Sequence, residues 1–286
     1  MSNLLPEIRE ICRLLEISPA RSKGQNFLTN EKIYEDIVAA AEIDSEDTVL
    51  EIGPGLGFLT LKLAAKAKRV MAVELDDKLA NYLQMGLAAA SINNIEIYNE
   101  DILKFNLNKH LPENNPYKVV ANLPYNITSV FLRLFLSQAH QPESLILMLQ
   151  KEVAQRIVVN APDMNLLALS VQYYADPEII REVKAGNFWP EPKVDSAIIK
   201  LTVRQAAKKP LKDRLIEDKL FFRLAKAGFS AKRKMLKNNL AGGLKIDQKL
   251  VIDALVKNKF NPSARAEDLS LADWQKLFAA LRVFML

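Results

Sequence analysis

The chain has 286 residues, 49% hydrophobic and 26% charged, which is long enough to bury one large core with a smaller appended domain. This composition excludes disorder as the default, and no stretch reaches the roughly 18 consecutive apolar residues of a membrane helix. A single cysteine excludes an intrachain disulfide framework, and two isolated histidines do not suggest a metal site.

The positive charge is concentrated in the C-terminal part of the chain. The formal net charge is +5, but residues 204–286 contain 19 Lys and Arg against 8 Asp and Glu, a net charge of +11. Residues 1–203 carry −6. Such asymmetry suggests a polyanionic partner, because neutralising phosphates and releasing counterions supplies sequence-independent affinity for nucleic acid. From charge alone, a solvated basic face is an equally good explanation.

Residues 4–15 have apolar positions at helical spacing, interrupted by charged residues, which predicts an amphipathic helix. This segment lacks the apolar core of a secretory signal, and its acidic residues argue against a transit peptide, so we expect a cytoplasmic protein. Ser18-Pro19 ends the helix, and residues 21–28 are predicted to form a loop before a second helix at 31–41. Residues 1 to about 22 are thus expected to be an N-terminal helical extension.

From residue 48 onward, apolar runs rich in β-branched residues alternate with helical patterns. This alternation predicts an α/β fold with a doubly wound, mostly parallel sheet. A later helix is followed by two β-rich runs that predict an antiparallel edge. The expected strands are 48–52, 69–73, 95–98, 118–121, 144–149, 178–183 and 196–203. The expected helices run from Gly57 through Leu63, from the cap Asp76 to about Ala89, from 129 to 137, and beyond 167.

A polar segment that ends in proline, residues 205–210, predicts a domain boundary, with domains at 1–205 and 206–286. Helical periodicity makes the second domain small, all-helical and basic. Its expected helices are 215–227, 231–240, 248–256 and 271–284.

Three of the nine glycines, Gly53, Gly55 and Gly57, lie within five residues after the first strong strand. Glycine allows positive φ and close approach of a ligand, and in a doubly wound sheet this turn would lie where ligands bind. The spacing matches neither the dinucleotide fingerprint nor a P-loop, which disfavours phosphate binding. A purely structural tight turn remains the alternative.

Two acidic residues follow the next two strands. Glu74 would end the second strand, where a carboxylate can accept hydrogen bonds from both hydroxyls of a ribose. Asp101 follows the third strand and could accept from an adenine amino group while Ile102 covers the ring. Either acid alone is more often a helix cap or a solvated residue. Together with the glycine turn, they indicate S-adenosylmethionine as the cofactor.

Asn122-Leu123-Pro124-Tyr125 follows the fourth strand and suits methylation of the exocyclic N6 of adenine. This nitrogen is a poor nucleophile because its lone pair is delocalised into the ring. The side-chain oxygen of Asn122 and the backbone carbonyl of Leu123 could accept the two amino protons, which positions the lone pair for attack. Pro124 would restrict the loop, and Tyr125 could stack on an unpaired or flipped base. An Asn-x-Pro turn with a packed tyrosine is the structural alternative.

At this point the sequence resembles the ribosomal RNA adenine dimethyltransferases, in particular the bacterial small-subunit dimethyladenosine transferases. The likeness spans nearly the whole chain and implies a Rossmann-like class I methyltransferase fold. The motifs that carry it are, in order, residues 24–28 (GQNFL), 51–55 (EIGPG), 122–126 (NLPYN), 188–196 (FWPEPKVDS) and 229–240 (FSAKRKMLKNNL). Ala231-Lys232, where the family often has Gln-Arg, and Arg21-Ser22-Lys23 are departures that bear on docking more than on chemistry.

The resemblance implies more than the local chemistry does. It places Asn26 and Leu28 with Gly53, Glu74, Asp101 and Asn122 around the cofactor, and Phe188 near the target adenine opposite Tyr125. It also implies dimethylation of two adjacent adenosines in a hairpin loop near the 3′ end of small-subunit rRNA, on an assembling subunit, by a monomer without metal. The basic domain then becomes the expected RNA-docking part, through Lys226, Lys232, Arg233, Lys234 and Lys237 on and before a helix beginning near residue 231.

The sequence leaves alternative functions open. The large-subunit resistance methyltransferases share the N-terminal core, and mitochondrial relatives share the motifs. A non-catalytic assembly factor that binds pre-ribosomal RNA would belong to another class. DNA adenine methylation is disfavoured because no target-recognition domain is evident, and a Ser-His-Asp hydrolase because no G-x-S-x-G elbow appears.

Overall fold

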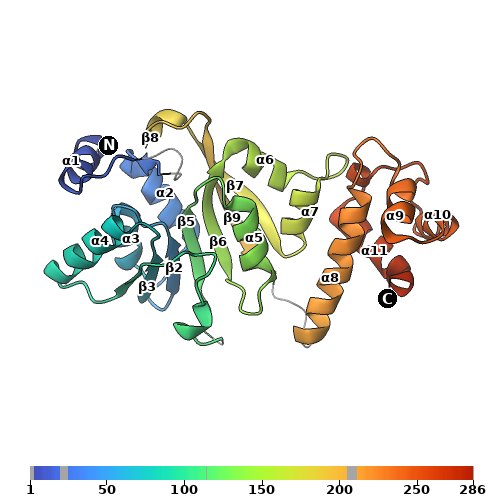
Figure 1. Ribbon diagram of the computed structural model, residues 1–286, viewed down its shortest axis with the longest axis horizontal. Helices are drawn as coiled ribbons and strands as arrows, with labels where there is room; N and C mark the ends of the chain where they lie inside the picture. Colours follow the sequence, from blue (N-terminus) through green and yellow to red (C-terminus); the bar gives the residue numbers. More distant parts are fainter. Residues whose placement is uncertain (1–2, 20–24, 114, 205–210, 286) are drawn as a thin grey trace. The chain divides into compact units, whose positions relative to one another are not determined.

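The computed structural model describes residues 3–19, 25–113, 115–204 and 211–285. The chain divides into two compact units (Figure 1): residues 1–155 with 175–204, and residues 156–174 with 205–286. The expected boundary at 205–210 lies outside the described residues. Residues 156–174 pack within the second unit, which the expected domains 1–205 and 206–286 did not anticipate.

A seven-stranded sheet forms the centre of the first unit, in the order β4-β3-β2-β5-β6-β9-β7. The strands β2 to β6 pair in parallel, and β9 is antiparallel to both β6 and β7. The prediction of a mostly parallel, doubly wound sheet with an antiparallel pair at one edge is confirmed. The strands are β2 Thr48–Ile52, β3 Arg69–Val73, β4 Ile95–Tyr98, β5 Lys118–Asn122, β6 Ser144–Gln150, β7 Ala175–Val183 and β9 Ser196–Val203.

Apart from Glu51, the central strands are apolar in their buried parts without alternation, because both faces of a parallel sheet are covered by helices. Neighbouring residues such as Val49 and Leu50, or Val119 and Val120, are therefore all fully buried although they point to opposite faces. The chain passes from β2 outward through β3 to β4 and then returns to β5 on the other side of β2. This reversal creates the switch point at the C-terminal ends of β2 and β5.

The helices of the first unit begin where the sequence places capping residues. The side chain of Asn30 accepts a hydrogen bond from the backbone of Lys32, and that of Asp76 accepts from Lys78 and Leu79, so Asp76 is a helix cap as expected. The helices are α1 Leu5–Leu14, α2 Glu31–Ala41, α3 Phe58–Ala64, α4 Asp77–Ala89 and α5 Thr128–Ser137, with α6 Lys151–Val158 crossing between the units and short 3-10 turns at Leu107–Lys109 and Ala185–Asn187.

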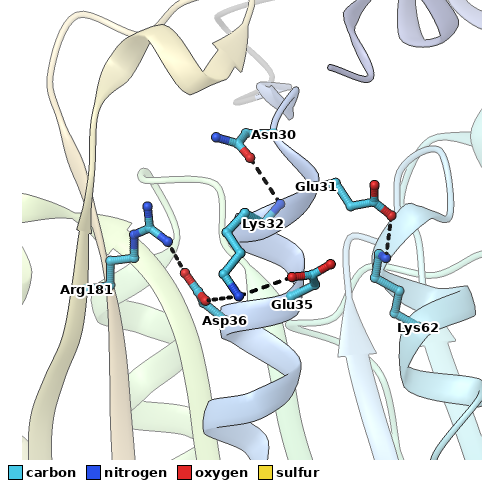
Figure 2. Close-up of polar contacts among 7 residues, drawn as sticks. All are labelled: Asn30, Glu31, Lys32, Glu35, Asp36, Lys62 and Arg181. Carbon is cyan, nitrogen blue, oxygen red and sulfur yellow. Dashed lines mark hydrogen bonds and ion pairs between the residues drawn. The ribbon is translucent and has the colours of Figure 1, made fainter. Parts of the chain in front are cut away.

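Charged side chains connect α2 to the elements on either side of it (Figure 2). Asp36 pairs with Arg181 of β7 and with Lys32 one turn earlier, and Lys32 also contacts Glu35. At the start of the same helix, Glu31 accepts from Lys62 of α3 at 2.8 Å. These pairs are partly exposed, so each contributes little energy alone. The Asp36–Arg181 and Glu31–Lys62 pairs link α2 to neighbouring elements, whereas the Lys32 pairs lie within the helix.

A second sheet of two short strands was not predicted. β1 (Phe27–Leu28) pairs antiparallel with β8 (Phe188–Trp189), which brings the Gln-Asn-Phe-Leu motif beside the Phe-Trp-Pro motif. Helix α1 packs on this pair: Ile8 and Cys12 form a cluster with Phe27, and the guanidinium of Arg9 lies 5.7 Å from the ring centre of Trp189. The N-terminal helix thus supports the segment that carries Asn26.

The second unit is all-helical, and its core is built around the fully buried Trp274 of α11 and Phe221 of α8. A Cβ at Gly228 would lie 2.3 Å from the Trp274 ring, so only glycine allows α8 to end there. The buried carboxylate of Asp218 accepts hydrogen bonds from Tyr173 and Tyr174 at 3.0 and 2.9 Å, which ties α8 to the segment after α7. The helices are α7 Leu166–Gln172, α8 Leu211–Gly228, α9 Leu236–Leu244, α10 Gln248–Lys257 and α11 Leu271–Leu281, with 3-10 turns at Ala266–Asp268 and Arg282–Phe284.

One helix of this unit was placed wrongly from sequence. The expected helix 231–240 begins only at Leu236, and residues 229–235 form turns between α8 and α9. The physical reason is the buried Asn239, whose side-chain amide donates to the carbonyls of Gly228 and Ala231 at 2.7 and 3.0 Å. These two carbonyls are hydrogen-bonded to a side chain. Residues 229–235 therefore fold back over α9 and do not extend it at its N-terminus.

Candidate active site

A cavity of about 350 Å³ lies at the C-terminal ends of β2, β3, β4 and β5. Its volume is in the range of small-molecule sites, and it lies at the switch point where doubly wound sheets bind ligands. All eight residues predicted to bind the cofactor line it, together with Pro124 of the predicted catalytic loop. The eight are Asn26, Leu28, Gly53, Gly55, Glu74, Asp101, Ile102 and Asn122.

The glycine turn adopts the conformation that its composition predicts. Gly53, Gly55 and Gly57 have φ of +66°, +60° and +86°, values that other residues rarely adopt. A Cβ at Gly53 would meet no atom within 4 Å, so this position leaves open space beside the cavity. At Gly55 a Cβ would lie 3.3 Å from the ring of Phe27, so the turn also packs closely against β1.

Glu74 is 7% exposed and points its carboxylate back to the glycine turn. Its two oxygens accept from the backbone N–H groups of Gly55 at 3.0 Å and of Asp76 at 2.9 Å. Burial raises the pKa of Glu74 above its ordinary value, and the two backbone donors oppose that rise. Each oxygen has a second lone pair, so the group can still accept from two ligand hydroxyls.

Asp101 and Ile102 lie in a loop that side chains hold against the sheet. One oxygen of Asp101 accepts from the backbone of Leu103 at 3.0 Å, and Ile102 is buried with its side chain in the cavity wall. The loop is tied back by Phe105, which stacks on His110 with ring centres 5.1 Å apart. The carboxylate of Asp101 is therefore attached to a backbone segment whose position is fixed by these contacts.

Asn122 ends β5, and its side-chain amide nitrogen donates to the backbone carbonyl of Asn26 at 3.2 Å. This bond orients the amide and leaves its oxygen as the atom that can accept from a bound molecule. Leu123 is buried and does not line the cavity with its side chain, as suits a residue predicted to act through its backbone carbonyl. Pro124 closes a turn in which the backbone of Ile127 donates to its carbonyl at 3.2 Å.

Two buried acceptors of the cavity have no hydrogen-bond partner among the described residues: Oδ1 of Asn26 and Oε2 of Glu51. Glu51 is 1% exposed, and burial raises its pKa to about 8; the neighbouring Thr60 hydroxyl opposes this rise, and the charge of Glu74 adds a smaller increase. Unpaired buried acceptors are costly, so both oxygens fit a ligand that brings donors or positive charge. The ammonium and sulfonium of S-adenosylmethionine supply both.

Glu51 belongs to the motif at residues 51–55, but no role was predicted for it. The signal was its place as the penultimate residue of β2, where a charged residue interrupts an otherwise apolar run. Gln25 and Tyr34 also line the cavity without having been predicted. The side chain of Gln25 donates to Asp76 at 3.2 Å, and the hydroxyl of Tyr34 donates to the carbonyl of Leu28 at 3.2 Å.

The two aromatic residues expected at the target base, Tyr125 and Phe188, differ in their burial. Tyr125 is half-buried beside the cavity-lining Pro124, and its hydroxyl is 2.8 Å from that of Ser196. Phe188 is 4% exposed and packs in the core cluster that contains Ile33 and Ile198. Neither Tyr125 nor Phe188 lines the cavity, so the contact of both rings with the target adenine stays a prediction.

The five predicted RNA-docking cations come from three consecutive segments of the second unit. Lys226 lies in α8, Lys237 in α9, and the others in the turns between them. Lys237 is half-buried and the other four are exposed. None of the five forms an ion pair within the described part of the chain, so their charges are free to meet an anion.

The strand order, the glycine turn after β2 and the acidic residue after β3 define a Rossmann-like methyltransferase. A family model described as "Ribosomal RNA adenine dimethylase" matches residues 18–282. The chain therefore belongs to the ribosomal RNA adenine dimethylase family. No helix in the described residues is long and apolar enough to cross a membrane.

Similar proteins carry names that agree with this family. The chain is 41% identical to the "Ribosomal RNA small subunit methyltransferase A" of Dehalococcoides mccartyi over 275 residues, which cover 96% of this chain and 92% of the relative. A crystal structure of a dimethyladenosine transferase from Plasmodium falciparum superposes with a TM-score of 0.77 at 27% identity, covering 90% and 98% of the two chains. The 23S rRNA methyltransferase ErmE gives a TM-score of 0.70 at 27% identity, covering 90% and 99%.

Proposed function

We propose that this chain transfers methyl groups from S-adenosylmethionine to N6 of two adjacent adenosines in a hairpin loop near the 3′ end of small-subunit rRNA. The enzyme class, an S-adenosylmethionine-dependent rRNA adenine dimethyltransferase, follows from the family and its curated relatives. The observation that carries the chemistry is the orientation of Asn122, whose amide nitrogen is bound by Asn26 so that its oxygen can accept. The substrate in an assembling subunit, a monomeric enzyme and a cytoplasmic location are parts of the same proposal.

The cofactor would be held by residues at three neighbouring strand ends. Glu74 would accept from the ribose hydroxyls, Asp101 from the adenine amino group, and Ile102 would cover the ring. Leu28 and the glycine turn would form the remaining wall, with the unpaired oxygens of Asn26 and Glu51 facing positive charge. When bound, the cofactor supplies an electrophilic methyl group.

The protein's own contribution to the reaction is to position and polarise the amino group. Asn122 Oδ1 and the carbonyl of Leu123 would accept its two protons, so that the nitrogen lone pair develops and points at the cofactor. Neither acceptor needs to become protonated, because fixed dipoles stabilise the charge built up on nitrogen. The nitrogen gains the methyl group as the methyl–sulfur bond breaks, and it then releases one proton to solvent. Tyr125 would stack on the adenine after it leaves its own base stack.

Glu51 makes cofactor binding dependent on pH. Burial raises its pKa to about 8, so the free protein holds this carboxyl group mainly protonated at neutral pH. A neighbouring cation favours the carboxylate and lowers that pKa, so binding releases a proton. We expect affinity for S-adenosylmethionine to rise with pH up to about 8. The rise should be smaller for S-adenosylhomocysteine, which lacks the sulfonium charge.

Calorimetric titrations in buffers of different ionisation enthalpy would measure this proton release. Glu51→Gln is the matched variant, since it keeps the size of the side chain and removes its titration. Any proton release from the ligand's own ammonium also occurs with the Glu51→Gln variant, so the difference between the two proteins isolates the contribution of Glu51. An unchanged pH dependence in Glu51→Gln would contradict the assignment to this residue.

The exposed cations between α8 and α9 are the proposed RNA-docking surface. We expect reversing Arg233 and Lys234 to Glu to weaken binding of unmethylated small subunits about tenfold or more and to flatten its salt dependence, while cofactor affinity is unchanged. Reversing Lys249 and Lys257 of α10 makes the same charge change elsewhere in the unit and is the control. Binding would be measured at several salt concentrations. Equal affinity and equal salt dependence of the two double variants would refute the assignment of this surface to RNA docking.

Two alternatives are separated by product analysis. Three curated relatives that are 41%, 39% and 39% identical to this chain carry small-subunit names, which favours the small subunit over the large one. Mass spectrometry of RNA from both subunits after reaction should show two N6,N6-dimethyladenosines in the small-subunit hairpin only. Modification of large-subunit RNA would favour the resistance type. Absence of methyl transfer, with RNA binding intact, would favour a non-catalytic assembly factor.

A further inference from the structure

Ser196 meets the catalytic loop from a strand far along the chain. Its Oγ lies 2.8 Å from the hydroxyl of Tyr125, and either atom can be the donor. Ser196 is fully buried, and it lies 71 positions after Tyr125 in the sequence. Burial raises the pKa of Tyr125, so its hydroxyl stays protonated and able to hydrogen-bond. The contact joins the residue proposed to stack on the target base to the rigid sheet.

The backbone of Ser196 is held on every side. It is the first residue of β9 and pairs with Gln150 of β6 and Val183 of β7. The preceding residue, Asp195, accepts from the backbone of Ala185 at 3.0 Å through its carboxylate. Its carbonyl accepts from the backbone of Lys151 at 2.9 Å. The serine hydroxyl is therefore a fixed point to which a loop side chain can be attached.

We infer that Ser196 is a positioning residue that holds the Tyr125 ring in place for the target adenine. The inference rests on the proposed function of Tyr125. The phenolic oxygen lies on the long axis of the ring, so a bond to it fixes where the ring lies without preventing rotation about that axis. The Tyr125 backbone is held in the Pro124 turn, and its hydroxyl is held by Ser196. A base that stacks on the ring would therefore enter the pocket to a fixed depth.

Base depth matters most for the second methyl transfer. The first transfer leaves N6-methyladenosine, which has a single amino proton and a bulkier nitrogen. Its alignment therefore relies on one fewer hydrogen bond to Asn122 and Leu123, and more on the ring that stacks on the base. A loosened Tyr125 should slow both transfers, the second more than the first, and N6-monomethyladenosine should accumulate.

The test compares Ser196→Ala, Tyr125→Phe and the double variant in single-turnover reactions with unmethylated small subunits. Each single variant lacks one partner of the same bond, and we expect each to react about fivefold more slowly, with a raised fraction of monomethyl product. The double variant should react no more slowly than the slower single one. Cofactor affinity should match that of the unaltered protein.

Ser144→Ala is the matched control, because it removes a buried hydroxyl from the first residue of β6 in the same sheet. It should leave the rate and the product ratio unchanged. The inference is overturned if Ser196→Ala matches the unaltered enzyme in both readouts, or if the two single effects multiply in the double variant. Failure of the unaltered enzyme to methylate adenosine at N6 would overturn the proposed function instead, so the two failures are distinct.

Discussion

Replacing Asn122 with alanine is expected to lower the rate of methyl transfer by about 10²- to 10³-fold, the loss typical of removing one preorganised polar group from an active site. The amide oxygen of Asn122 is the one side-chain acceptor proposed for the amino group, and Asn26 fixes its direction. Alanine leaves one amino proton without its acceptor. Affinity for S-adenosylmethionine should change only a few-fold, because Glu74 and Asp101 are untouched.

Single-turnover transfer of a labelled methyl group, combined with calorimetric titration of the cofactor, measures the two effects separately. Asn126→Ala is the matched control, since Asn126 lines the same cavity but is exposed and lies within the turn that follows the two proposed acceptors. An Asn122→Ala enzyme within about tenfold of the unaltered rate would remove the side-chain acceptor from the proposed chemistry. Loss of cofactor binding in parallel with activity would leave Asn122 only the cofactor-binding role that was also predicted for it.

The sheet could be predicted from sequence because its pattern is local. Strands buried on both faces appear as short continuous apolar runs, and β2, β3 and β4 have the predicted bounds. The parallel order then places every strand's C-terminal end at one edge, so Glu74, Asp101 and Asn122 could be brought together without knowing any contact. The cavity at that edge is lined by all three.

Contacts between distant segments could not be predicted. β1 and β8 are two residues each, too short for a periodic pattern, and their pairing joins Leu28 to Phe188. Burial of Phe188 follows from this pairing, and the resemblance alone had placed that ring at the target base. The helix start near residue 231 was wrong for a related reason, because the side chain of Asn239 satisfies the carbonyl of Ala231, which the sequence pattern assigned to a helix.

Glu74→Ala is expected to lower affinity for the cofactor by about 10²-fold, since the carboxylate would lose two charge-assisted hydrogen bonds from the ribose. The variant should still fold, because Glu74 is a buried acid whose pKa is raised by its surroundings. Glu100→Ala, which removes an exposed carboxylate from the rim of the same cavity, is the control and should bind normally.

The choice of ligand separates the roles of the two buried acids. S-adenosylmethionine and S-adenosylhomocysteine share their ribose, so Glu74→Ala should weaken both by the same factor. Glu51→Gln removes the negative charge of a carboxylate proposed to face positive charge, so it should weaken S-adenosylmethionine more than S-adenosylhomocysteine. Calorimetric titration of both ligands with both variants gives four affinities. If Glu74→Ala distinguished the ligands and Glu51→Gln did not, the cofactor would lie in the reverse direction along the cavity, with its ribose at Glu51.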